Sequence, residues 1–128
     1  MIKKYFFKFL IFLFFFANAF SQAKPLPPSY LTVELLEHPE RVFITDFTPE
    51  FGWVMTSDLQ NNYQTAYQIL VASSKDSLAK NVGAWWDTGK IKLNHSINIE
   101  YAGKQLMPNS NYYWQVRTWD RENNSSDY

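Results

Sequence analysis

The stretch LMPNSNYYWQVRTWD, residues 106–120, decides how this chain folds. Its second half alternates as a β-strand does, because successive side chains of a strand point to opposite faces of a sheet. One face is compact and apolar, and we expect it to face a hydrophobic core; it consists of Tyr112, Trp114, Val116 and Thr118. The other face is mixed and should meet water or a neighbouring surface; it consists of Tyr113, Gln115, Arg117 and Trp119.

The residues just before this strand carry a second signal. Leu106, Pro108 and Tyr112 give the spacing L-x-P-x-x-x-Y. This spacing resembles the tyrosine corner of fibronectin type III and related β-sandwiches, in which a tyrosine near the start of strand F bonds through its hydroxyl to nearby backbone. We therefore expect the hydroxyl of Tyr112 to hold the turn that precedes the strand.

The sequence ahead of this stretch predicts further short strands separated by turn residues. They are expected at residues 31–37, at 41–44, after Pro49, and at 66–74, 85–91 and 95–101, with one helical turn possible in residues 75–83. The alternating positions that should point inward are Phe51, Trp53, Met55, Tyr67, Ile69, Val71, Ile97, Ile99 and Tyr101. About six strands without a long helical period predict an all-β, fibronectin type III or immunoglobulin-like antiparallel sandwich.

The N-terminus predicts a secretory signal peptide at residues 1–23. Three lysines precede an unbroken apolar run at residues 9–17, and small residues follow, so that cleavage is expected after Ala19 or Ala23. The apolar run is shorter than the roughly 20 residues that a membrane-spanning helix needs. A retained N-terminal anchor helix is the alternative. The signal predicts a secreted or periplasmic protein.

Residues 24–30 should form a proline-rich linker, and residues 31–128 the sandwich itself.

The composition of the chain narrows the classes of partner that it could bind. Without the signal, the formal charge is 9 − 12 = −3, because residues 1–23 hold three of the 12 basic residues and no acid. Such a domain has no basic patch for nucleic acid, and no membrane association is expected after signal removal. The chain has no cysteine, which excludes disulfides, Cys-based zinc sites and a lipoprotein anchor.

The C-terminal tail, residues 121–128, resembles a hairpin loop whose second strand is missing. A sandwich of this type needs one more strand along the edge of the strand at residues 112–119. An unpaired strand edge exposes a row of N–H and C=O groups, which natural proteins avoid. We therefore expect a C-terminally truncated sandwich that is part of a longer polypeptide.

Seven motifs along the chain, taken in order, resemble one family. They are LTVE at 31–34, PEFGW at 49–53, QTAYQI at 64–69, VASS at 71–74, WDTGK at 86–90, YAGKQL at 101–106 and YYWQVRTWD at 112–120. Together they resemble the N-terminal fibronectin-III-like domain of bacterial α-L-rhamnosidases, a group of glycoside hydrolases. The resemblance extends over essentially the whole chain after the signal.

This resemblance implies a non-catalytic accessory module of a large exported enzyme. Such enzymes are inverting glycosidases that remove terminal L-rhamnose from glycans or glycosides, and their catalytic carboxylates sit in an α/α barrel far downstream. No position in this chain matches that catalytic motif. The implied partners are the downstream domains of the same polypeptide, and carbohydrate is a further possible partner.

The residues themselves show no catalytic arrangement. Inverting hydrolysis needs two carboxylates about 6.5–9.5 Å apart, and the sequence shows no such pair on a shared surface. Asp87 and Asp120 stand at strand ends beside tryptophans, where Asp usually bonds the backbone of a turn. His38 and His95 lack a second histidine at ligand spacing. We therefore predict no catalytic residue, no metal and no cofactor.

Two aromatic features are candidate binding surfaces. Trp85 and Trp86 are adjacent, so one ring should lie in the core and the other should point outward. Tyr113, Arg117 and Trp119 should form a second outward surface. Such rings can stack on sugars or be buried in a domain–domain interface, where Trp, Tyr and Arg are enriched. We favour the interface.

Two alternatives to an accessory module remain open. One is a stand-alone carbohydrate-binding module that uses the exposed Trp and Tyr rings, and the other is a generic adhesion or spacer domain. All three share one predicted core, which consists of Trp53, Tyr67, Ile69, Val71, Ile97, Ile99, Tyr112, Trp114 and Val116.

Overall fold

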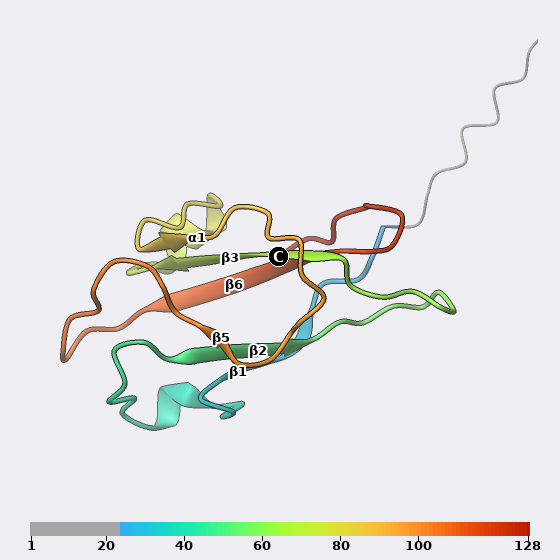
Figure 1. The fold of residues 1–128 in the computed structure, drawn as a ribbon. Coiled ribbons are helices and arrows are strands. Elements are labelled where there is room, and N and C mark those ends of the chain that lie inside the picture. The colour runs from blue at the N-terminus through green and yellow to red at the C-terminus, as the bar shows by residue number, and fades with distance from the viewer. Residues whose placement is uncertain (1–23) are drawn as a thin grey trace, which may run out of the picture.

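Two antiparallel sheets pack face to face in the computed structural model, which describes residues 24–128 (Figure 1). The first sheet has the order β1-β2-β5, with β1 at Ser29–Val33, β2 at Glu50–Val54 and β5 at Ile99–Glu100. The second has the order β4-β3-β6, with β4 at Trp86–Asp87, β3 at Ala66–Ala72 and β6 at Tyr113–Trp119. The predicted antiparallel sandwich is confirmed.

Strand β3 is the centre of the second sheet, and every one of its residues is buried. It pairs with β6 along its whole length, from Ala66 opposite Trp119 to Ala72 opposite Tyr113. Its inner face packs in the main core, as the alternation of residues 66–72 predicts. The end of its outer face at Leu70 and Ala72 is covered by the short helix α1, Lys75–Ala79, whose Leu78 packs on these two residues. The helical turn predicted in residues 75–83 is confirmed.

Strand β6 shows the two faces that its sequence predicts. On the inner face, Val116 and Thr118 are 1% and 0% exposed. Trp114 and Tyr112 also pack against the main core but are only half-buried. The tyrosine corner is confirmed, because the backbone N–H of Met107 donates a hydrogen bond to the hydroxyl of Tyr112 at 2.9 Å. This bond holds the turn that leads into β6.

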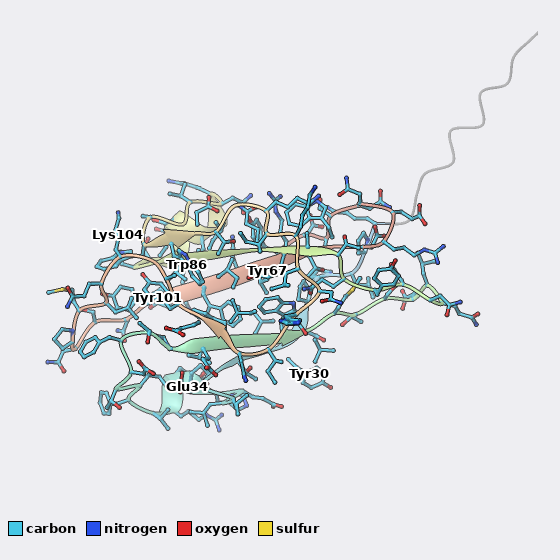
Figure 2. The ribbon with its side chains drawn as sticks, in the orientation of Figure 1. Tyr30, Glu34, Tyr67, Trp86, Tyr101 and Lys104 are labelled. Carbon is cyan, nitrogen blue, oxygen red and sulfur yellow. The ribbon has the colours of Figure 1, made fainter. Side chains whose placement is uncertain are left out.

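Aromatic contacts join the two sheets across the core. Phe51 of β2 lies with its ring centroid 4.6 Å from that of Trp114, and Trp53 meets Tyr67 edge-on at 5.2 Å. Figure 2 shows Tyr67 together with Trp86 and Tyr101 between the sheets. Aromatic pairs in this distance range stabilise a core beyond the area they bury. The large rings therefore act as the main link between the two layers.

The prediction that Ile97 points inward is wrong, because its side chain is 58% exposed. Asn98 adopts a left-handed backbone conformation, with φ of 54°. That residue interrupts the alternation, and β5 is reduced to Ile99–Glu100. Ile99 packs against the core and Tyr101 is buried, as predicted.

The strand predicted at residues 41–44 is also wrong. A single 3-10 turn, η1 at Pro39–Arg41, occupies this region, and Phe43 is 96% exposed. Proline favours the first position of a helical turn, since its missing N–H has no partner there in any case. The preceding strand is also shorter than residues 31–37, because Glu34 and Leu35 both have positive φ and end β1 at Val33.

The strand predicted at residues 85–91 is divided. Only Trp86–Asp87 forms β4, a turn follows at Gly89 with φ of 59°, and Ile91 pairs again with Tyr67 through two backbone hydrogen bonds. β1 begins at Ser29, inside the stretch expected to be a linker.

The tail after β6 turns back toward its own strand, as the predicted hairpin loop requires. Trp119 and Ser125 form a bridge, and the N–H of Ser126 donates to the carbonyl of Thr118 at 2.9 Å. The predicted signal peptide at residues 1–23 lies outside the described residues. Among residues 24–128, no helix has the length and apolar character needed to cross a membrane.

Candidate binding surfaces

A polar chain crosses the outer face of the second sheet. Arg117 of β6 lies opposite Gln68 of β3, and its Nε and Nη2 donate to Gln68 Oε1 at 3.0 and 2.6 Å. The amide of Gln68 in turn donates to Asp87 Oδ1 on β4 at 2.7 Å. Three strands are therefore tied together by side chains that point away from the core.

Two aromatic rings flank the guanidinium of Arg117. The rings of Trp119 and Tyr128 each lie 4.9 Å from it, and Lys90 Nζ lies 4.6 Å from the ring of Trp119. Burial raises the pKa of Tyr128; the nearby Arg117 lowers it and Asp87 raises it further. The rings of Trp119 and Tyr128 thus already contact cations of the same chain, which contribute about 0.5–1 kcal/mol each at exposed sites.

Tyr113 lies at the other end of β6. It packs against the small outer cluster of Leu70 and Leu78, with Lys75 Nζ 5.4 Å from its ring. Trp119 follows Tyr113 by six positions, which is roughly 20 Å along a strand. The structure therefore does not bring Tyr113 together with Arg117 and Trp119, which lie side by side.

The expected split of Trp85 and Trp86 into one inward and one outward ring is wrong. Both are half-buried and both pack against the main core. Trp85 meets Tyr112 edge-on at 4.8 Å, and Trp86 meets Tyr101 at 5.1 Å. β4 begins at Trp86, so the alternation rule for strands does not apply to Trp85.

The two carboxylates beside tryptophans hold turns, as the sequence predicts. Asp120 is buried and accepts hydrogen bonds from the backbone N–H groups of Glu122 and Asn124 at 3.0 and 2.8 Å. Asp87 accepts from the N–H of Gly89 at 2.8 Å. Over residues 24–128, no group of three or more His, Asp or Glu side chains is placed to hold a metal ion.

One buried polar residue has no counterpart in the sequence-based interpretation. Gln64 accepts a hydrogen bond from Trp53 Nε1 at 2.9 Å and donates to the carbonyls of Leu93 and His95. It thus fastens the loop before β5 to the core tryptophan. Its only sequence signal is its position just before a buried strand, which does not distinguish it from a solvated glutamine.

A large hollow lies at one end of the sandwich. We call this hollow the end cleft; it has a volume of about 1480 Å³ and lies between residues 39–49 and 106–115. Its floor is made of core side chains, among them Phe51, Val71 and Trp114. Its rim carries exposed apolar residues: Val42, Phe43, Phe47 and Met107. In the sequence, this cleft is indicated by a group of apolar residues at 42–47 that belong to none of the strands.

Comparisons with known proteins agree on one relationship. The family model described as "Rha78A-like, N-terminal immunoglobulin domain" matches residues 28–128. An alpha-L-rhamnosidase of Formosa agariphila is 34% identical over 87 residues, which are 68% of this chain and 9% of that protein. One from Streptomyces avermitilis is 38% identical over 80 residues, 62% of this chain and 8% of that protein.

Two solved structures share the fold. The alpha-L-rhamnosidase from Dictyoglumus thermophilum matches with a TM-score of 0.75 and 36% identity, over 79% of this chain and 11% of that one. The Streptomyces avermitilis alpha-L-rhamnosidase, solved with L-rhamnose, matches with a TM-score of 0.72 and 33% identity, over 79% and 9%. The chain thus spans about a tenth of the length of these relatives.

Proposed function

This chain belongs to the Rha78A-like, N-terminal immunoglobulin domain family, and from that premise we propose that it is an accessory domain of a longer α-L-rhamnosidase-like polypeptide. In this role it packs against downstream domains, and the parent polypeptide hydrolyses terminal L-rhamnose from glycans or glycosides. The names and lengths of the matched relatives support the parent activity.

In this proposal the exposed apolar rim of the end cleft is the surface that packs against the downstream domains. Phe43 is almost fully exposed, and Phe47 and Met107 are exposed beside it. Contiguous apolar patches of this kind on soluble proteins usually mark interaction sites. The segments that carry the rim, residues 42–47 and 106–110, lie at the end of the sandwich opposite the loop of residues 57–63 (Figure 1). The rim therefore defines which end would face the rest of the polypeptide.

The length of the native polypeptide tests this role first. An immunoblot of the source cells, with an antibody to residues 31–128, should show a band many times larger than 15.1 kDa. A band at or below that mass would overturn the proposed function. It would make an autonomous binding module the leading interpretation.

A charge at the rim tests the packing itself. We expect Phe43→Asp to change the free energy of unfolding of the isolated chain by less than about 0.5 kcal/mol. Substitutions of exposed residues usually change this quantity little. In the native-length polypeptide the same change should lower the midpoint of thermal unfolding, because it would place an unpaired charge in an interface. Leu59→Asp is the matched control, since Leu59 is an exposed apolar residue of the loop at residues 57–63, which lies at the opposite end. Equal effects of the two changes would contradict packing through the rim.

A carbohydrate-binding module is the second candidate. The observation that favours it is the half-buried Trp119, whose ring lies beside Arg117 and Lys90 on the outer face. Titration of the chain with L-rhamnose would distinguish the two roles. Binding that is lost in Trp119→Ala but kept in Tyr113→Ala would support this candidate over the accessory role.

We also propose that the polypeptide is exported, either secreted or held in the periplasm. The support is the charge and apolar pattern of residues 1–23. Mass spectrometry of the protein from its cells should find an N-terminus at Phe20 or Lys24. An intact Met1 would contradict cleavage.

A further inference from the structure

A small polar groove lies on the outer face of the second sheet, between the end of α1 and the C-terminal tail. Figure 1 shows α1 and the tail on the same side of this sheet. The groove has a volume of about 360 Å³, and the ring of Tyr128, which packs against the cluster around Leu78, forms one of its walls. We call it the tail groove; its polar and aromatic lining consists mainly of Lys24, Asn81, Gln115, Arg117, Asp127 and Tyr128.

Arg117 lines the tail groove with part of its guanidinium free. A guanidinium carries five N–H groups in a fixed, planar arrangement. Two of them, at Nε and Nη2, donate to Gln68, and the others make no hydrogen bond to residues 24–128. The free edge between Nη1 and Nη2 can donate two parallel hydrogen bonds to one carboxylate. Because Gln68 already fixes the side chain, little ordering is needed when a ligand binds.

Gln115 and Asn81 add neutral polar groups to the same groove. Gln115 precedes Arg117 by two positions on β6, so both side chains lie on one face, roughly 7 Å apart along the strand. Gln115 Nε2 donates to the carbonyl of Leu78 and to Asn81 Oδ1, at 3.1 and 3.2 Å. Within the described part of the chain, Gln115 Oε1 and Asn81 Nδ2 make no hydrogen bond of their own. An acceptor and a donor thus remain, which suit hydroxyl groups that both donate and accept.

The charges around the tail groove favour an anion. The described part of the chain has a formal charge of 9 − 12 = −3. Among the side chains that line the groove, however, Lys24 and Asp127 form an ion pair, and the remaining charge is that of Arg117. Asp87 does not line the groove, and its carboxylate already accepts from Gln68. A negatively charged ligand would therefore meet one uncompensated positive charge.

We propose that the tail groove binds a sugar acid, that is, a hydroxyl-bearing ring with one carboxylate. The carboxylate accepts from the free edge of Arg117, the hydroxyl groups bond Gln115 and Asn81, and the ring packs against Tyr128. The volume of the groove lies at the lower end of the range for small-ligand sites, about 300–1,000 Å³. This inference does not depend on the proposed function, and the groove is distinct from the surface at Trp119, which does not line it.

Titration of the chain with D-glucuronate tests the proposal. Nuclear magnetic resonance follows the side-chain amides of Asn81 and Gln115 and the indole N–H of Trp119. We expect the two amide signals to shift with a dissociation constant on the order of 1 mM, and the indole signal to stay in place. D-glucose lacks the carboxylate and acetate lacks the hydroxyl groups, so each should bind at least about tenfold more weakly.

Substitutions in the groove test the role of each group. Arg117→Met keeps the apolar stem and removes the donors, and it should weaken binding by at least about tenfold. Lys90→Met is the matched control; it removes one positive charge beside Trp119, outside the groove, and should change the affinity by less than about twofold.

Asn81→Gly is a second variant, because the loss of Arg117 also leaves Gln68 without its partner. Glycine tolerates the positive φ of 56° at position 81, so the backbone is kept while the amide is removed. We expect this change to weaken binding by about threefold. Unchanged affinity in both Asn81→Gly and Arg117→Met would overturn the proposal.

The other outcomes are equally decisive. Equal affinity for D-glucuronate and acetate would show that the groove recognises only an anion, and shifts at Trp119 alone would move the binding to that ring. Equal losses in Arg117→Met and Lys90→Met would replace the groove by a general charge effect. Each of these results overturns the proposal and leaves the proposed function intact.

The methyl glycoside of D-glucuronate distinguishes two sources of the ligand. Its anomeric oxygen is blocked, as it is in a glycan. Binding at least as tight as that of the free acid would support a unit of a glycan chain as the ligand. Weaker binding would support a free sugar acid.

Discussion

At the scale of single residues, two tyrosine hydroxyls hold the loops at one end of the sandwich. Tyr112 accepts from the backbone of Met107, and the hydroxyl of Tyr101 donates to the carbonyls of Lys104 and Trp85, at 2.7 and 3.3 Å. The approach is close enough that only glycine fits at position 103. A Cβ there would lie 2.5 Å from the Tyr101 hydroxyl.

The tyrosine corner gives a first prediction. Tyr112→Phe should lower the free energy of unfolding by about 1 kcal/mol, because the N–H of Met107 loses its partner while the ring keeps its contact with Trp85. Urea unfolding would measure the change. Tyr113→Phe is the matched control, since the hydroxyl of Tyr113 makes no hydrogen bond to other residues of the described part. An equal loss in the control would contradict a specific role for the corner.

At the scale of elements, strand length is set by single residues in the left-handed region. Glu34 and Leu35 end β1, and Asn98 shortens β5. Among residues 24–128, five of the eight non-glycine residues with positive φ are asparagines, the type that adopts this conformation most readily after glycine. The turns between the strands therefore follow the distribution of asparagine more closely than the apolar pattern.

Asn98 gives the prediction at this scale. Asn98→Val should destabilise the domain by about 1–2 kcal/mol, because a β-branched side chain is strained at φ of 54°. The midpoint of thermal unfolding should fall by roughly 4–8 °C for each kcal/mol lost. Asn98→Gly is the control and should change the midpoint little. If valine is tolerated as well as glycine, the left-handed conformation does not limit β5.

At the scale of the whole molecule, folding buries tyrosines on both sides of the second sheet. Burial raises the pKa of Tyr67 and of Tyr101 from the usual value of 10.0, and the nearby Tyr112 raises that of Tyr101 further. The pKa of Tyr128 is also raised, by burial and by Asp87 against the opposing effect of Arg117. Because all three pKa values are raised, the stability of the fold should depend on pH in the alkaline range.

The sandwich should therefore lose stability in base. Well below pH 10.0 these tyrosines are protonated in both the folded and the unfolded chain, and they contribute no pH dependence. Above it, the unfolded chain ionises first, so the free energy of unfolding falls as pH rises toward the raised folded pKa. The slope is at most about 1.4 kcal/mol per pH unit for each tyrosine.

Urea unfolding between about pH 8 and about pH 11 would measure this slope. Tyr67→Phe should make it shallower, because one buried group no longer titrates, and should leave the stability near neutral pH little changed. Identical slopes for the two proteins would contradict a contribution from Tyr67.

Local alternation predicted the best-formed elements correctly. The faces of β3 and β6 and the tyrosine corner follow from spacing alone, because a strand buried on one or both faces leaves a period-2 pattern. The same rule failed at Ile97 and Trp85. Asn98 breaks the alternation beside Ile97, and Trp85 precedes the first residue of β4.

The sequence by itself determined the fold class, the inner face of β6 and the absence of cysteine chemistry, since each depends on residue type and near neighbours. Only the tertiary structure decided the rest. It seated Arg117 between the rings of Trp119 and Tyr128 and opened the end cleft beside Trp114. These features join residues far apart in the chain, and their geometry depends on how the two sheets pack and where pairing along β6 stops.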